Sequence, residues 1–207
     1  GPGAGAARKR VVGRHLAVVV QPHDLAVVIG EVLRRVRFEV ALGRHLPIAE
    51  GEEFVTEMAY SGVPEPVISA GFPTGWLTTD AGGAYVIGEP DGAATWFPGN
   101  DHPSDKATLT LSATVPRGWV VASNGAFDGR RRDGDAVTWA WSEDDPIATY
   151  LVTIAIDRFR VVEEETDRGL PLISFYPEDD ADRLTEDFAD AGDMIEAALV
   201  ALDDHGL

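Results

Sequence analysis

Apolar and polar residues alternate with a period of two through the middle of the chain. Residues 108–115 place Leu109, Leu111, Ala113 and Val115 on one side and only threonine and serine on the other. Such alternation is typical of a half-buried β-strand. Weaker forms of the same pattern, or short apolar runs, predict further strands at residues 53–60, 119–122, 136–141, 148–156 and 159–162.

Turn-forming residues separate these segments. Residues 76–79 and 84–87 flank Asp-Ala-Gly-Gly, which predicts a hairpin. Prolines and glycine at 61–66, the Asn-Gly pair at 124–125 and a charged stretch at 130–134 predict turns or loops. Strands that recur about every 8–12 residues indicate an all-β domain, and we expect a mainly β, antiparallel β-sandwich.

The hydrophobic period changes after residue 177. Leu184, Phe188, Ile195, Leu199 and Leu202 are spaced by four, seven, four and three residues. This spacing predicts one amphipathic helix over residues 180–203. Acidic residues gather in its first half, where the positive end of the helix dipole favours them. We expect its apolar side to need a partner outside the chain.

The first 44 residues have a different character from the rest. They hold eight basic residues and three acids, a net charge of +5, which leaves −23 for the remainder. The apolar run 16–20 is short, is broken by Gln-Pro-His-Asp and lacks a small-x-small cleavage site, so it favours a β-strand over a signal peptide. Residues 25–38 fit a strand or a helix equally well. The glycine-rich start is expected to be a mobile tail.

Composition narrows the class of protein. The chain has 207 residues, a net charge of −18 and no cysteine, and its pI is about 4.5. The negative charge disfavours nucleic acid and anionic membranes as partners. The absence of cysteine excludes disulfides, thiolate metal sites and a cysteine nucleophile. No apolar run approaches the roughly 18 residues of a membrane span, and we expect a soluble cytoplasmic protein.

Common catalytic motifs are absent from the sequence. It contains no His-Glu-x-x-His, no Gly-x-Ser-x-Gly, no phosphate loop and no dinucleotide fingerprint. Metal binding by His23 with Asp24, or by His102 with Asp101 and Asp105, stays open, although isolated histidines beside acids favour surface pairs. The many carboxylates indicate a solvated acidic surface, and the five tryptophans are expected to be core residues.

Three motifs, in order along the chain, identify a family. Residues 96–103 read Trp-Phe-Pro-Gly-Asn-Asp-His-Pro and are followed by Ser-Asp-Lys-Ala-Thr. Thr-Val-Pro at 114–116 precedes Val-Ala-Ser-Asn-Gly at 121–125, and Pro-Ile-Ala-Thr-Tyr-Leu occupies 146–151. Together these segments resemble the aminopeptidase N family of zinc metallopeptidases, over about residues 45–207.

The resemblance implies a domain organisation. A saddle-like β-sandwich N-terminal domain is expected at 45–177, and the first helix of a catalytic domain, as a stub, at 178–207. Residues 1–44 match nothing in the family and are expected to be divergent and partly disordered. The family's Gly-x-Met-Glu-Asn and its zinc helix are absent. The resemblance therefore implies an inactive chain without catalytic or metal-binding residues, whose zinc lies in a catalytic domain provided in cis or in trans.

One functional residue is carried over from the family. Glu89 stands twelve residues before Asp101, where family members place a glutamate that holds the free α-amino group of a peptide substrate. A carboxylate on a β-hairpin can accept a charge-assisted hydrogen bond from an ammonium group. Ile87 departs from the glutamine common at its position, so the first pocket is expected to differ. Asp101 and Lys106 are expected to have structural roles.

Two functions follow from these residues. The first is the non-catalytic N-terminal β-domain of a zinc-dependent aminopeptidase that acts on peptide N-termini. The second is a stand-alone β-module that binds peptides or proteins through the surface around Glu89, without catalysis.

Overall fold

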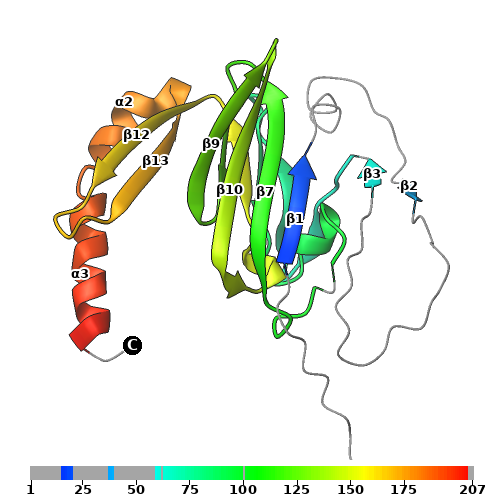
Figure 1. Cartoon of the computed structure of the whole chain (residues 1–207), viewed down its shortest axis with the longest axis horizontal. Helices are drawn as coiled ribbons and strands as arrows, with labels where there is room; N and C mark the ends of the chain where they lie inside the picture. Colours follow the sequence, from blue (N-terminus) through cyan, green and yellow to red (C-terminus); the bar gives the residue numbers. More distant parts are fainter. Residues whose placement is uncertain (1–14, 21–36, 40–58, 62, 100, 205–207) are drawn as a thin grey trace, which may run out of the picture.

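The computed structural model describes residues 15–20, 37–39, 59–61, 63–99 and 101–204. Two β-sheets form the body of this part of the chain, and a hairpin with two helices extends from them (Figure 1). Three of the seven strand pairings in these two sheets join strands that are neighbours in sequence, and the other four join strands that are distant in the chain.

The first sheet has four strands in the order β1-β7-β10-β9. Their bounds are His15–Val20 for β1, Ala107–Pro116 for β7, Ala136–Ile147 for β10 and Ala126–Asp133 for β9. β10 is antiparallel to both β7 and β9, whereas β1 runs parallel to β7. The register places Leu111 opposite Trp141, so the apolar positions of both strands lie on one face.

The second sheet has five strands in the order β4-β5-β6-β11-β8, all antiparallel. Their bounds are Val67–Ser69 for β4, Phe72–Thr78 for β5, Ala84–Ile87 for β6, Ile154–Asp157 for β11 and Val120–Ser123 for β8. Two small pairs complete the strands: β2 (Arg37–Glu39) with β3 (Ala59–Ser61), and β12 (Phe159–Glu165) with β13 (Pro171–Pro177).

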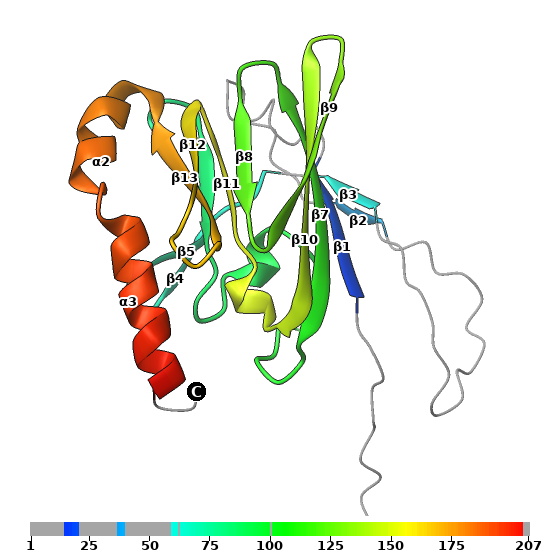
Figure 2. The same cartoon turned by 60° about the vertical axis from the view of Figure 1, so that its left-hand side comes forward.

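The hydrophobic core lies between the two sheets, which stand side by side in Figure 2. Alternate residues of β7 are fully buried, and Ile154 and Ile156 of β11 meet them from the other sheet. Trp141 joins the layers, because its indole Nε1 donates to the carbonyl oxygen of Val121 at 3.2 Å. All five tryptophans are buried, which confirms their expected place in the core.

The sequence predicted most of this architecture. The mainly β, antiparallel sandwich is confirmed. The predicted hairpin is formed by β5 and β6, whose register pairs Thr78 with Ala84. The strands expected at 16–20, 108–115, 119–122, 136–141 and 159–162 are β1, β7, β8, β10 and β12.

The charged loop predicted at 130–134 is wrong, because β9 continues through these residues to Asp133. Arg130 pairs with Trp139 of β10, and its guanidinium carbon lies 5.1 Å from the centre of the Trp139 ring. The arginines therefore belong to a strand at the edge of the first sheet. Charged side chains suit that position because they discourage pairing with another strand.

The single strand predicted at 148–156 is also wrong. A 3-10 turn, η2 (Thr149–Leu151), interrupts the apolar run before β11 begins. The run stays apolar because Ala148 and Val152, on either side of the turn, are buried like the alternate residues of the strand that follows. A short apolar run does not distinguish these two conformations.

The helix predicted at 180–203 is divided into α2 (Ala181–Asp187) and α3 (Ala191–Asp204), with η3 (Glu178–Asp180) before them. Tight turns separate the helices, with Ala189 N bonded to the Glu186 carbonyl and Ala191 N to that of Phe188. Glu186 and Asp187 fall in the last turn of α2, where the helix dipole disfavours acids. The strand β13 was missed, since residues 171–177 lack a clear alternation.

Several predictions lie outside the described residues. The strand expected at 53–60 is described only at its end, as part of β3, and the segment 25–38 only at Arg37 and Phe38 of β2. The mobile tail and the pair formed by His23 and Asp24 also lie outside. The domain boundaries after residues 44 and 177 stay predictions.

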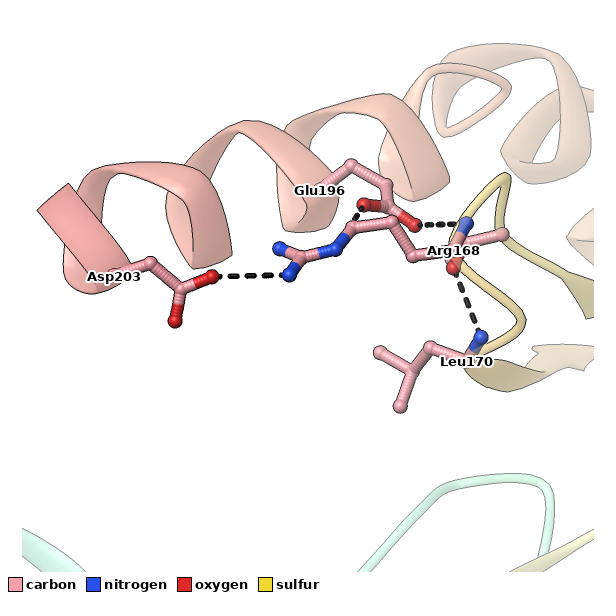
Figure 3. A network of polar contacts seen from close by, with 5 residues as sticks. Arg168, Leu170, Glu196 and Asp203 are labelled. Carbon is pink, nitrogen blue, oxygen red and sulfur yellow. Dashed lines mark hydrogen bonds and ion pairs between the residues drawn. The ribbon is translucent and has the colours of Figure 1, made fainter.

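The loop between β12 and β13 holds α3 through Arg168 (Figure 3). The Arg168 amide donates to Glu196 Oε1 at 2.9 Å, and its guanidinium Nη2 donates to Asp203 Oδ2 at 3.0 Å. The pKa of Glu196 is lowered, chiefly by a side-chain hydrogen bond from Thr166; burial opposes this, and the Arg168 amide and charge lower the pKa further. We call Arg168, Glu196 and Asp203 the arginine clamp.

The lowered pKa of Glu196 predicts a pH effect on α3. A carboxyl with a depressed pKa in the folded state stabilises it at neutral pH and loses that contribution as the pH falls through the folded value. Hydrogen exchange of residues 191–204 should therefore accelerate, relative to the core strands, as the pH falls from about 4.5, the ordinary pKa of this carboxyl. Glu196→Gln should exchange faster at neutral pH and show no such change. An unaltered pH profile in Glu196→Gln would contradict this role.

Candidate functional site

Glu89 lies just beyond the end of β6, in the second sheet. Along β6 the side chains of Ala84 and Val86 are buried in the core, and those of Tyr85 and Ile87 are exposed. Gly88 is buried and Glu89 is exposed. The strand thus carries the backbone out of the core and leaves the carboxylate at the surface, on an element anchored by its buried face.

The turn that follows is closed by short hydrogen bonds. Gly92 N donates to the Gly88 carbonyl at 2.7 Å. Thr95 Oγ1 donates to the Gly92 carbonyl at 2.7 Å, and it accepts a hydrogen bond from Trp76 N of β5 at 3.1 Å. Residues 88–92 are therefore tied both to the 3-10 turn η1 (Ala93–Thr95) and to the neighbouring strand. The peptide bond between Glu89 and Pro90 is cis.

Both glycines of this turn stand where the backbone passes very close to other backbone. A Cβ on Gly88 would lie 2.2 Å from the Tyr150 carbonyl oxygen, and a Cβ on Gly92 would lie 2.5 Å from Gly75 N. Real side chains do not approach backbone atoms so closely. The motif Gly-Glu-Pro-Asp-Gly, which lacks the Lys-Ser/Thr of a phosphate cradle, is a tightly packed support for Glu89.

The 3-10 turn η2 connects this support to distant segments. Thr149, which is buried, donates from Oγ1 to Asp101 Oδ1 at 2.9 Å. On its other side Asn124 Nδ2 donates to the Leu151 carbonyl at 3.0 Å, and Asn124 Oδ1 accepts from Thr153 N at 2.7 Å. The three motifs singled out in the sequence, at 96–103, 121–125 and 146–151, therefore meet around η2 beside the Glu89 turn.

Asp101 contributes to this packing, because its carboxylate accepts the hydrogen bond from Thr149. The backbone of Asp101 has a positive φ of 42°. Residues whose roles sequence reasoning missed are Gly88, Gly92, Thr95 and Thr149, which fix the turn; the two glycines and Thr149 are buried, and Thr95 is half-buried. Paired glycines flanking an acid were the available signal for the first two. Thr149 lies within the motif at 146–151, but the role of neither threonine could be predicted, because their hydrogen-bond partners are 19 and 48 residues away.

The carboxylate of Glu89 makes no hydrogen bond or ion pair with any residue that the structure describes. Lys106 and Arg117 are exposed, and the ion pairs found in the described ranges use other acids. An exposed, unpaired carboxylate on a rigid turn can accept hydrogen bonds from a cationic ligand.

The described residues offer no metal site. Among them no group of three or more histidine, aspartate or glutamate side chains is arranged around a common point. His102 instead closes a local turn, with its Nδ1 2.8 Å from Ser104 Oγ and its carbonyl accepting from Asp105 N. No helix in the described part of the chain combines the length and apolar character needed to cross a membrane.

The described residues thus form a β-sandwich that presents an exposed carboxylate on a tightly packed turn, and no group of three or more potential metal ligands lies among them. Residues 70–151 match the family described as the peptidase M1 N-terminal domain. This match confirms the resemblance read from the motifs.

Individual proteins agree with this assignment. A probable aminopeptidase 1 of Sulfurisphaera tokodaii is 31% identical over 98 residues, covering 46% of this chain and 12% of that protein. Human glutamyl aminopeptidase is 35% identical over 85 residues, covering 41% of this chain and 9% of the enzyme. The match thus spans only about a tenth of each curated relative.

A solved structure is similar over a longer stretch. A two-domain M1 zinc metallopeptidase with bound L-arginine aligns with a TM-score of 0.59 and 26% identity, over 70% of this chain and 36% of that one. The similarity therefore reaches beyond residues 70–151, and most of the two-domain protein lies outside it.

Proposed function

We propose that this chain supplies the non-catalytic N-terminal β-domain of a zinc-dependent aminopeptidase, which removes N-terminal residues from peptides. The observation that carries the proposal is the Glu89 turn: an exposed carboxylate, unpaired among the described residues, held by backbone contacts at Gly88 and Gly92 inside the family match.

Glu89 would act by binding the α-ammonium group of the substrate. A carboxylate accepts a charge-assisted hydrogen bond from an ammonium and so distinguishes a free N-terminus from an internal amide. The hydrogen bonds to Gly88, Gly92 and Thr95 hold the turn before the substrate arrives. Such pre-organisation matters because an anchoring group must place the first peptide bond at a fixed distance from the reacting centre.

Among the described residues, no group of three or more histidine, aspartate or glutamate side chains is placed to hold zinc. We therefore assign zinc and the activation of water to a catalytic domain, joined in cis or provided in trans. By this proposal the chain alone has no aminopeptidase activity and holds no stoichiometric zinc.

The test compares Glu89→Gln with Glu65→Gln in an enzyme assembled from this chain and an M1 catalytic domain. Glu65 is an exposed acid before β4, so it controls for the change in charge. A hydrogen bond to a charged group contributes about 1.5–3 kcal/mol, so KM for an aminoacyl anilide should rise about tenfold or more in Glu89→Gln only. Unchanged kinetics in Glu89→Gln would contradict the assignment.

The second candidate is a stand-alone module that binds peptides or proteins without catalysis. The exposed side chains of Tyr85 and Ile87, 38% and 40% accessible, support it because they lie on β6 just before Glu89. Fluorescence titration of the isolated chain separates the two functions. Binding of a peptide with a free N-terminus, but not of its acetylated form, without any partner domain would favour the module.

A further inference from the structure

Asn124 and Gly125 form a dipeptide that is chemically labile in an unfolded chain. The chain has two asparagines, and only Asn124 is followed by glycine, which has no side chain to hinder attack by its own amide nitrogen. In this reaction the Gly125 nitrogen attacks Cγ of Asn124. The new N–Cγ bond closes a succinimide ring, the Cγ–Nδ2 bond breaks, and Nδ2 leaves as ammonia with the Gly125 amide proton. Water then opens the ring to aspartate or isoaspartate at position 124.

The fold holds both reacting groups away from this reaction. Asn124 Oδ1 accepts a hydrogen bond from Thr153 N at 2.7 Å, and Asn124 Nδ2 donates to the Leu151 carbonyl at 3.0 Å. These two bonds hold the side-chain amide against η2 and the residue before β11. Gly125 has a φ of 77°, and a Cβ on it would collide with the Ser142 carbonyl, so its peptide unit has little room to turn. Both restraints must be released before the ring can close.

The product does not fit the same hydrogen bonds. An aspartate carboxylate has no proton to donate to the Leu151 carbonyl, and it places a negative charge beside that oxygen. Isoaspartate also adds a carbon to the backbone. The Leu151 carbonyl belongs to η2, in which the Tyr150 carbonyl packs against Gly88. A change at position 124 therefore reaches the support of the Glu89 turn.

We propose that Asn124 is a site of spontaneous deamidation, controlled by its hydrogen bonds to Leu151 and Thr153. In the native fold these bonds protect the side-chain amide. When η2 opens, the amide reacts with the Gly125 nitrogen, and the product keeps η2 from closing. Opening thus becomes irreversible, as it does for unfolded chains that are modified faster than they refold. The modification needs only the chain and water, so it stands independently of the proposed function.

The experiment follows position 124 in the whole chain by peptide mass spectrometry, which distinguishes the amide from the acid. Samples are kept in mildly alkaline buffer with and without guanidinium chloride. Deamidation should be slower by about tenfold or more in the folded chain, because it then requires an opening step. Equal rates in the two samples, or no reaction at Asn124 in the unfolded chain, would contradict the proposal.

A pair of variants tests whether η2 is the gate. Thr149→Val removes the hydrogen bond that fixes η2 to Asp101. Thr114→Val is the matched control: it removes the bond between Thr114 and Thr138, whose hydroxyl oxygens lie 2.8 Å apart in the first sheet. Deamidation at Asn124 should accelerate about fivefold in Thr149→Val, the factor expected for one lost hydrogen bond, and not in Thr114→Val. Equal acceleration in both variants would mean that the reaction needs global unfolding, and η2 would not control it.

Asn124→Asp tests the effect of the product. Hydrogen exchange at the amides of Leu151 and Val152, which close η2, should accelerate about tenfold or more, because the Leu151 carbonyl loses its donor. The amides of β7 in the same sample should exchange as in the unchanged chain. Unchanged exchange in η2 would overturn the claim that the product keeps it open. If Asn124→Asp does not fold, an aged and partly deamidated sample of the unchanged chain gives the same measurement.

Discussion

Leu111→Ala is expected to destabilise the domain by about 3 kcal/mol or more, the usual range when a fully buried leucine is truncated. Leu111 has no exposed surface. It lies in the centre of β7, opposite Trp141 of β10, and the core cluster extends from it to the second sheet. Strands on both sides fix the backbone, so the cavity left by the substitution cannot close by local movement.

Urea unfolding followed by tryptophan fluorescence measures this effect directly, because all five tryptophans are buried. Leu170→Ala is the control. Leu170 is 40% exposed in the β12–β13 loop, and its substitution should change the free energy of unfolding by less than about 0.5 kcal/mol. If Leu111→Ala and Leu170→Ala changed the free energy of unfolding equally, Leu111 would not lie in a core that the two sheets share.

The sequence was most informative where packing acts on one strand at a time. The alternation at 108–115 predicted β7 because every second residue of that strand faces the core. The glycine-containing turn at 80–83 predicted the β5–β6 hairpin for a similarly local reason. Both features depend on residues close together in the chain, and these are what periodicity and turn chemistry describe.

The sequence was less informative where distant residues decide the structure. Residues 148–153 are as apolar as a strand, but the hydrogen bond from Thr149 to Asp101 stabilises a 3-10 turn there. Residues 130–133 are as charged as a loop, but pairing with Trp139 and its neighbours makes them a strand. Glu89 was predicted as a site residue through family motifs, but its support could not be predicted, because the groups packed against Gly88 and Gly92 come from β5 and η2.

Gly88→Ala is expected to destabilise the domain by about 3 kcal/mol, near the upper end of what overpacking a tight site costs. The new methyl group would lie 2.2 Å from the Tyr150 carbonyl oxygen. That oxygen belongs to the backbone of η2, which the buried Thr149 fixes. Relief therefore requires β6 and η2 to separate, and the Glu89 turn would move with β6.

Gly192→Ala provides a control of opposite sign. Its methyl group would meet only Leu172 Cδ2, at an ordinary contact distance of 3.8 Å. It lies within α3, where alanine is favoured over glycine by up to about 1 kcal/mol. The same unfolding experiment should show a small gain for Gly192→Ala beside the large loss for Gly88→Ala. A Gly88→Ala domain of normal stability would mean that η2 yields easily, and Glu89 would then lack the rigid support on which its proposed role depends.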